Sequence, residues 1–424
     1  MGRISCGNRA LVVVAAPAGP YIYGPQSLRE TLVNYQYGSG PADVDEFFRE
    51  KKSWSKVKDK IVGDYINCYL KTVPKLGRPI LIVDAFAGPG RFGDGTDGSP
   101  LIICKAMRHA ANRSSCLFAD VSAGHRAALE ENLSEYIEAG VCDHPYEDCE
   151  RALTRAIEMG SGSTIFFYLD PYGIRDLEFD IVKQIYEREI KRSTEVLINF
   201  NFRTFMRMSG NWGFGDSASE VARKVKKSKI ETVNSVMGGD YWQRIVCDPQ
   251  LGKIEREDAV VNAYLERVRE YFKYGYAIPV KERQEDEVGI PVDELAHYHL
   301  IFGTRSSRAV MYMNDVALNA LDPYLRQFKD GLLFDFTPQR HLPVRRDVAK
   351  NAIVESVSER PLKRPEIYEA VIPRFFMHHK KKDYRAMVDE LTFSENRLFA
   401  DERAIKRRGQ LNDEVRLSAK PWRV

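Results

Sequence analysis

The chain has 424 residues and a formal net charge of +3, and 44% of its residues are hydrophobic and 29% charged. This length allows two or three domains with substantial cores, and the composition excludes a disordered or collagen-like protein. Seven cysteines without a C-x-x-C pair exclude a recognisable disulfide framework or zinc site and fit a reducing cytoplasm, and no apolar run reaches the length of a membrane span.

The first elements lead to a buried strand and a glycine loop. Residues 1–42, with their Gly, Pro and Tyr, are expected to form a tail or an irregular lead-in, and helical spacing of apolar residues predicts a helix over 43–71. The apolar run 80–83 predicts a parallel strand. It ends in Asp84 and continues as Ala85-Phe86-Ala87-Gly88-Pro89-Gly90.

Two nucleotide chemistries use such a loop. Gly88, Gly90 and Gly93 match the dinucleotide pattern G-x-G-x-x-G, whereas an acid-x-Phe-x-Gly-x-Gly loop is typical of S-adenosylmethionine binding. Turn residues follow Gly93, so the helix is expected to begin later, with Ser99 as N-cap and Pro100 at the first helical position. A long, acidic loop suits a cationic sulfonium better than a pyrophosphate. A strand-to-helix turn without a ligand is the remaining alternative.

Strands and helices then alternate along the body. We expect helices over 100–111, 122–133, 149–159 and 180–190, and strands over 115–119, around 141, 164–169 and 195–201. This order predicts an α/β fold with a doubly wound, mostly parallel, Rossmann-like sheet. Ligands bind such sheets at the carboxyl ends of the strands, where four polar side chains fall: Asp84, Asp120, Asp170 and Asn199.

Two of the acids fit parts of a nucleoside. Asp120 follows the second strand, where a carboxylate accepts hydrogen bonds from a ribose diol. Asp148 could accept from an adenine amino group, or could equally be the N-cap of the helix over 149–159.

The segment Asp170-Pro171-Tyr172-Gly173 distinguishes the two chemistries. The Asp170 carboxylate and the Pro171 carbonyl can accept both N–H groups of an exocyclic amine. The Tyr172 ring can stack on a base that has left its own stack. Positioning then supplies most of the catalysis. The alternative is an ordinary Asp-Pro turn.

These motifs resemble class I S-adenosylmethionine-dependent methyltransferases of the amino-methylating branch, although the second proline of their Asp-Pro-Pro-Tyr motif is absent. More narrowly, residues 47–321 resemble the bacterial three-Cys-motif partner family. The resemblance rests on five motifs: Trp54-x-Lys-x-Lys58, Asp84-Ala-Phe-Ala-Gly-x-Gly90, Gly98-Ser-Pro100, Leu169-Asp-Pro-Tyr-Gly173 and Gly238-Gly-Asp-Tyr-Trp242. It implies a methyltransferase-like fold and a partner with three cysteines, of the iron–sulfur or radical class.

A basic segment and two strands complete the body. Arg203, Arg207 and the lysines up to Lys229 could contact phosphates beside the site or form a solvated helix face. Strands are expected over 274–280 and 298–303, as the antiparallel pair that closes a methyltransferase sheet. His297 and His299 lack a third ligand at suitable spacing, so no metal site is predicted.

The C-terminal part is basic. From residue 340 onward the chain has 20 Lys and Arg against 13 Asp and Glu, a net charge of +7. Three helices over 346–356, 364–372 and 382–391, followed by a hairpin, predict a winged-helix module over 341–424 that binds nucleic acid or a protein. The predicted phosphate contacts are Lys380, Lys381, Lys382, Arg385, Arg407 and Arg408.

The sequence therefore predicts three parts: a tail over 1–42, a methyltransferase-like domain over 43–335 and the module over 341–424. The predicted function is methyl transfer from S-adenosylmethionine to an exocyclic amino group of a nucleic-acid base. The alternative is an accessory protein that binds S-adenosylmethionine and tethers the three-cysteine partner to nucleic acid. In both, the candidate cofactor contacts are Asp84, Phe86, Ala87, Gly88, Gly90, Asp120 and Asp148. In the methyltransferase, the candidate catalytic residues are Asp170, Pro171 and Tyr172.

Overall fold

The structure is a computed structural model, and it describes residues 48–108, 114–160, 162–188, 194–209, 220–281, 292–293, 295–330, 332, 335, 337–400 and 411–421. The predicted tail over 1–42 and the predicted contacts Arg407 and Arg408 lie outside these residues. Within the described part of the chain, no helix is both long and apolar enough to span a membrane.

A six-stranded sheet with the order β2-β1-β3-β4-β6-β5 lies at the centre of the body. Its strands are β1 Ile80–Asp84, β2 Ser114–Phe118, β3 Thr164–Leu169, β4 Thr194–Phe200, β5 Tyr274–Val280 and β6 Tyr298–Thr304. The first four strands are parallel, and β6 and β5 continue the sheet in antiparallel pairing. The predicted mixed α/β fold with a mostly parallel sheet is therefore confirmed.

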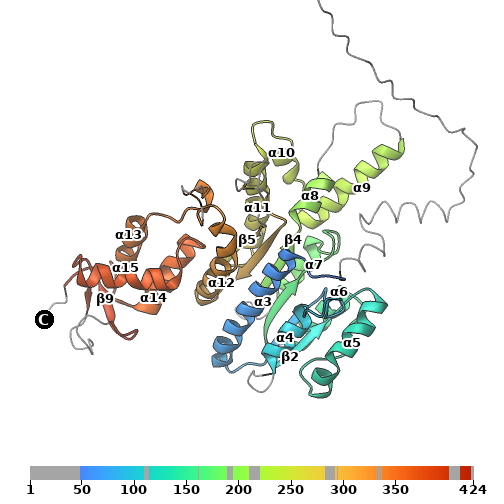
Figure 1. The fold of residues 1–424 in the computed structure, drawn as a ribbon, viewed down its shortest axis with the longest axis horizontal. Helices are drawn as coiled ribbons and strands as arrows, with labels where there is room; N and C mark the ends of the chain where they lie inside the picture. The colour runs from blue at the N-terminus through green and yellow to red at the C-terminus, as the bar shows by residue number, and fades with distance from the viewer. Residues whose placement is uncertain are drawn as a thin grey trace, which may run out of the picture. The chain divides into compact units, whose positions relative to one another are not determined.

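Helices cover both faces of the sheet because the inner strands are apolar at almost every position. Ile80 and Ile82 of β1 enter one hydrophobic cluster, and Leu81 and Val83 enter the other. The first face carries α3 Ser53–Thr72, α4 Ser99–Met107, α5 Ala123–Glu138 and α12 Ser307–Arg326. The second carries α6 Cys149–Met159, α7 Phe179–Tyr186, α8 Phe202–Ser209, α9 Glu220–Met237, α10 Trp242–Val246 and α11 Lys253–Arg269. Helices α3 and α12 lie side by side (Figure 1).

Two predicted elements differ most from the structure, and the helices expected over 122–133 and 180–190 end at Glu138 and Tyr186 instead. The helix expected over 43–71 begins at Ser53, after a turn. The strand expected around Val141 is reduced to two isolated parallel bridges, which pair Cys116 with Cys142 and Ala119 with Tyr146. Pro145 lies between these bridges and has no N–H group to donate, which prevents a continuous ladder.

The C-terminal residues form three helices and a small antiparallel sheet. The helices are α13 Arg346–Ser356, α14 Arg364–Val371 and α15 Lys381–Phe393, and the sheet has the order β7-β9-β8, from Leu362–Lys363, Arg416–Ser418 and Phe399–Ala400. Short 3-10 turns occur at Val73–Leu76, Gln339–His341 and Ile372–Phe375. The helices and strands share a separate hydrophobic cluster, which Met311 of α12 also joins.

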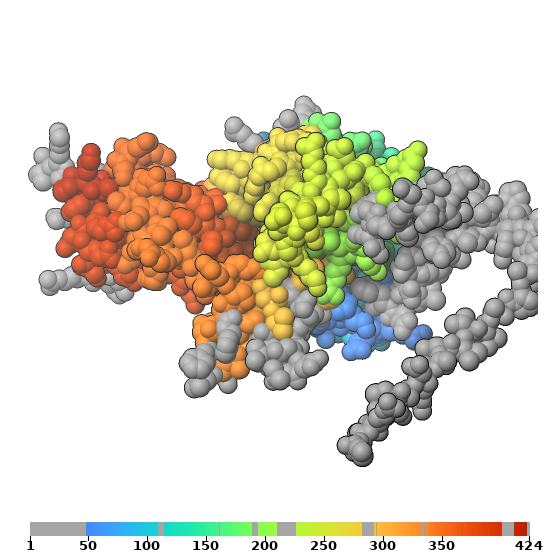
Figure 2. All heavy atoms as spheres, turned by 90° about the horizontal axis from the view of Figure 1, so that it is seen from above, coloured from blue at the N-terminus to red at the C-terminus, as the bar shows by residue number. Residues whose placement is uncertain are grey.

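The C-terminal helices are bound to the body through β5 and α12. The Tyr276 ring stacks on Phe376 at 4.1 Å between ring centroids, and its hydroxyl donates to the Pro373 carbonyl at 2.6 Å. Asn314 is fully buried and exchanges hydrogen bonds with the Met377 N–H and the His379 carbonyl. Figure 2 shows the orange and red C-terminal residues in direct contact with the yellow region that contains α11 and β5.

Candidate functional site

Asp84 is the last residue of β1 and is completely buried. Its Oδ1 accepts from the Phe86 N–H at 3.2 Å, and its Oδ2 accepts from the Ser99 hydroxyl at 2.7 Å. Burial raises the pKa of Asp84 to about 7, although these two donors oppose the rise. The expectation that Ser99 caps the following helix is wrong, because its hydroxyl binds Asp84 and Gly98 is the N-cap.

The loop after Asp84 needs its first two glycines for backbone conformation and space. Gly88 and Gly90 have φ angles of 62° and 78°, which disfavour any residue with a Cβ. A Cβ on Gly88 would lie 2.7 Å from the Phe48 ring, and one on Gly90 would lie 2.8 Å from Leu129. The loop is fixed to the neighbouring strand, because the Ala87 N–H donates to the Ala119 carbonyl at 2.8 Å.

Gly93 does not lie in the first turn of a helix, as the third glycine of a dinucleotide-binding motif would. Its N–H donates to the Phe48 carbonyl at 2.7 Å, and a Cβ would lie 2.8 Å from the Arg49 carbonyl oxygen. Gly93 therefore makes room for the backbone that precedes α3, and it lies outside the helix that starts at Ser99.

Asp120 joins the glycine loop to Tyr172. Its Oδ2 accepts from the Gly88 N–H at 2.9 Å and from the Tyr172 hydroxyl at 3.2 Å. Its Oδ1 accepts from the Ser122 N–H at 2.8 Å and faces His125 Nδ1 at 3.2 Å. The Tyr172 ring therefore lies against the glycine loop, where burial raises the pKa of its hydroxyl.

Asp170 follows β3 and is surrounded by donors. Lys58 Nζ binds both carboxylate oxygens, at 2.9 and 2.7 Å. Asn199 Nδ2 donates to Oδ1 at 2.5 Å, and the Tyr168 hydroxyl donates to Oδ2 at 2.9 Å. A carboxylate offers about four acceptor positions, so these contacts occupy the group.

Lys58 is the main residue of the site to which sequence reasoning assigned no role. It lies on α3, 112 positions before Asp170, and only 6% of its side chain is exposed. Burial alone would lower the pKa of Lys58, but the attraction of Asp170 raises it, so the ammonium form of Lys58 is favoured. The one sequence signal was its place in the Trp54-x-Lys-x-Lys58 motif.

The charge around the loop is negative. Asp59 is paired with Lys51 and Asp170 with Lys58, and Asp84 and Asp120 add two further carboxyl groups. Burial is the largest cause of the raised pKa values of Asp59 and Asp84, and repulsion from Asp170 adds to both. Such a site favours a cationic ligand over a pyrophosphate.

The remaining predicted cofactor contacts lie around this loop and at α6. Phe86 is half-buried and packs on the second-face cluster, and Ala87 is buried. Asp148 is the N-cap of α6, with Oδ1 accepting from the Arg151 N–H at 2.7 Å. This was one of the two predicted alternatives; a contact of Asp148 with adenine stays a prediction.

The predicted nucleic-acid contacts differ in accessibility. Arg203 and Arg207 are exposed on α8, and Lys382 and Arg385 are exposed on α15. Lys380 and Lys381 are half-buried at the start of α15, where the Lys381 N–H donates to Asp315 of α12 at 2.9 Å.

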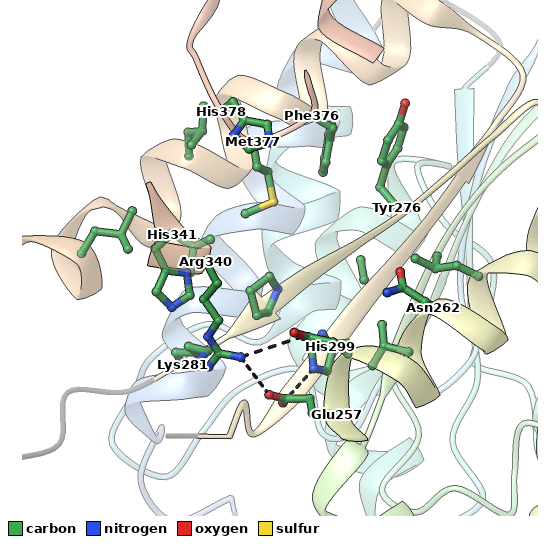
Figure 3. Close-up of a pocket in the computed structure, with 18 of the residues that line it drawn as sticks. Glu257, Asn262, Tyr276, Lys281, His299, Arg340, His341, Phe376, Met377 and His378 are labelled. Atoms are coloured by element: carbon green, nitrogen blue, oxygen red, sulfur yellow. Dashed lines mark hydrogen bonds and ion pairs between the residues drawn. The ribbon is translucent and has the colours of Figure 1, made fainter. Parts of the chain in front are cut away.

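A separate cavity of about 450 Å³ lies between the β5 edge of the sheet and the C-terminal residues (Figure 3). At its floor Glu257 Oε1 accepts from His299 Nε2 at 3.0 Å, and Arg340 forms ion pairs with Glu257 and Asp293. Asp293 also accepts from Lys281 at 2.6 Å. These paired charges explain how the chain after α12 is held on the body.

Comparisons with known proteins give weak matches. No protein-family model matches the chain, and no curated protein is significantly similar to it. Solved structures match parts of it at low identity. A protein from Legionella pneumophila has a TM-score of 0.36 and 8% identity, over 64% of this chain and 93% of its own. A SAM-dependent methyltransferase from Agrobacterium tumefaciens has a TM-score of 0.29 and 13% identity, over 58% of this chain and 62% of its own. A protein described as a putative rRNA-methylase from Clostridium thermocellum has a TM-score of 0.24 and 8% identity, over 52% of this chain and 86% of its own. TM-scores below 0.5 do not establish a common fold.

Proposed function

We propose that the chain is an S-adenosylmethionine-dependent methyltransferase that acts on an exocyclic amino group of a nucleic-acid base. The observation that supports this best is the set of carboxylates at the ends of β1, β2 and β3, of which Asp84 and Asp120 are buried and Asp170 is partly exposed, around a loop whose glycines adopt left-handed conformations. A sulfonium ligand with an ammonium group and one carboxylate has a net positive charge. It complements a site where Asp84 and Asp120 lie beside the lysine-paired carboxylates Asp59 and Asp170.

The residues present fit this cofactor. Gly88 and Gly90 allow the ligand to approach the backbone, and Asp84 uses only two of its four acceptor positions. Asp120 is placed to accept from a ribose diol once the Tyr172 hydroxyl moves away. When bound, the cofactor supplies an electrophilic methyl group on sulfur.

The acceptor amine is assigned to Asp170 and the Pro171 carbonyl. Two accepted hydrogen bonds would orient the nitrogen lone pair toward the methyl group, and a proton would leave to water after transfer. Tyr172 keeps its predicted place in this motif, and its hydroxyl contacts Asp120, a proposed cofactor residue.

The C-terminal residues are proposed to form a winged helix that binds nucleic acid. Their elements follow the order α13, β7, α14, α15, β8, β9, and Lys382 and Arg385 are exposed on α15. Basic side chains on the third helix of such a module are suited to phosphate contact.

One observation favours a second candidate, an accessory protein that binds S-adenosylmethionine and tethers a three-cysteine partner to nucleic acid. The donors Lys58, Asn199 and Tyr168 occupy Asp170. A substrate amine would have to displace one of them, whereas a binding protein would not need to release the carboxylate.

Two measurements test the proposal. Calorimetric titration should show binding of S-adenosylmethionine and none of NAD. Transfer of a labelled methyl group to total RNA or DNA should then be lost in Asp170→Ala while cofactor binding remains. Transfer that survives this substitution would refute the assigned chemistry, and transfer only in the presence of the partner would favour the accessory protein.

A further inference from the structure

Three aromatic side chains form a half-exposed strip beside Asp170. Trp54 comes from α3, and His297 and Tyr298 come from the start of β6. The Trp54 and His297 rings stack at 4.6 Å between centroids with an interplanar angle of 18°, and the Tyr298 ring follows at 6.3 Å from His297. We call these three residues the aromatic strip.

The aromatic strip reaches the candidate catalytic carboxylate through Lys58. Lys58 Nζ lies 4.6 Å from the centroid of the Tyr298 ring and 2.7 Å from Asp170 Oδ2. One ammonium group therefore contacts both the last ring of the strip and the group that would hold the acceptor amine.

Two exposed arginines flank the aromatic strip. Arg203 and Arg207 are four residues apart on α8 and so lie on the same face of that helix. Their charges act on Tyr298, and that of Arg203 acts on His297. Burial and then Arg203 lower the pKa of His297 to about 4, so this ring is neutral at pH 7. In the described part of the chain, neither arginine forms an ion pair with a carboxylate.

We propose that the aromatic strip is the stacking platform for unpaired bases of the acceptor strand, with Arg203 and Arg207 on the flanking phosphates. Neutral rings beside two exposed arginines match single-stranded nucleic acid, in which stacking and phosphate contact alternate. This inference rests on the proposed function and specifies how its substrate is held.

The test measures binding of fluorescein-labelled 12-mers of oligo(rA), oligo(dA) and the corresponding duplex to the full chain. Trp54→Leu should weaken binding of the single strands about ten-fold or more, as loss of a stacked base does, and should affect the duplex less. The paired change Arg203→Ala and Arg207→Ala should lower the slope of log affinity against log salt by about 1.4 for the single strand. The oligo(rA) and oligo(dA) measurements distinguish RNA from DNA.

Matched variants separate stacking from misfolding. Trp54→Phe retains a ring and should bind nearly as wild type. Tyr274→Leu removes a ring from the opposite end of the same strand pair, where Tyr274 is paired with Thr304, and should leave binding unchanged. A Trp54→Leu protein with native thermal stability and unchanged single-strand affinity would overturn the inference. The inference would also be overturned if Trp54→Leu weakened the binding of an acidic peptide, poly-glutamate, as much as it weakened the binding of the single strands.

Cofactor binding separates this inference from the proposed function. S-adenosylmethionine should bind wild type and Trp54→Leu equally in calorimetry, because Trp54 lies outside the glycine loop. Cofactor binding without any effect of Trp54→Leu on single strands would overturn the strip alone. If S-adenosylmethionine does not bind but Trp54→Leu still weakens single-strand binding, the proposed methyltransferase function would be overturned and the aromatic strip would remain a nucleic-acid site.

Discussion

Asp84→Asn is expected to stabilise the fold at pH 8 while weakening cofactor binding. Burial raises the pKa of this carboxyl from 3.8 to about 7 in the folded protein. Between pH 4 and pH 7 the folded state therefore holds a proton that the unfolded state has lost, so the free energy of unfolding falls as pH rises through this range. An amide at this position has no such charge to bury.

The size of the effect follows from the change in pKa. Ionising Asp84 in the folded state costs about 4 kcal/mol at pH 8 if all of this change is realised. The introduced amide can still accept from the Phe86 N–H and donate to the Ser99 hydroxyl, so we expect the variant to recover about 2 kcal/mol or more at pH 8 and to gain almost nothing at pH 4.

Cofactor affinity should change in the opposite direction. A cationic ligand binds the ionised carboxylate, so wild-type affinity for S-adenosylmethionine should rise between pH 6 and pH 7 with release of a proton, and level off above pH 8. Asp84→Asn should bind more weakly at pH 8 and lose this pH dependence. Urea unfolding and calorimetry at pH 4, 6 and 8 measure both quantities. A variant that is less stable than wild type at pH 8, or that keeps the pH-dependent affinity, would refute the reasoning.

Three further substitutions test other contacts. Lys58→Met leaves a largely buried carboxylate unpaired and should cost about 3 kcal/mol in urea unfolding, whereas Lys60→Met, in an exposed pair, should cost less than about 0.5 kcal/mol. Gly88→Ala should abolish cofactor binding in calorimetry, because its Cβ would overlap the Phe48 ring; Gly95→Ala, with a similar φ but no atom within 4 Å, should retain it. Tyr172→Phe should tighten cofactor binding a few-fold by freeing an acceptor position on Asp120, and unchanged or weaker binding would contradict this.

The sequence predicted the sheet well because the evidence for each strand is local. Strands β3 and β5 have the predicted bounds, and Asp84, Asp120 and Asp170 lie at strand ends as expected. Apolar runs that end in an acid carry this information within a few residues.

Contacts between distant residues could not be predicted in the same way. The pairing of Lys58 with Asp170 joins residues that are 112 positions apart, and no local pattern specifies which lysine reaches the strand end. Ser99 shows the same difficulty at short range, because a serine before a proline is typical of an N-cap, but tertiary structure gives its hydroxyl a buried carboxylate instead.

The orientation of Tyr172 could not be predicted from the motif. In the structure its hydroxyl lies on Asp120. The sequence predicted which residues meet at this edge, but the direction of the ring depended on the neighbouring loop, where Phe48 packs edge-on against it at 5.8 Å.

Lys58 links the two candidate functions to one structural event. Asn199 and Tyr168 bind Asp170 from buried positions in β4 and β3, and Lys58 binds it from a buried position on α3. Lys58 has a second contact that it would keep on leaving Asp170, because its ammonium group lies over the Tyr298 ring. Entry of an acceptor amine would then displace Lys58 from Asp170, while its ammonium group stayed over the Tyr298 ring of the aromatic strip. Both a base stacked on the strip and an amine bound to Asp170 would therefore affect the position of Lys58. If Lys58 instead stays on Asp170 when nucleic acid binds, the carboxylate remains occupied, and the accessory role follows.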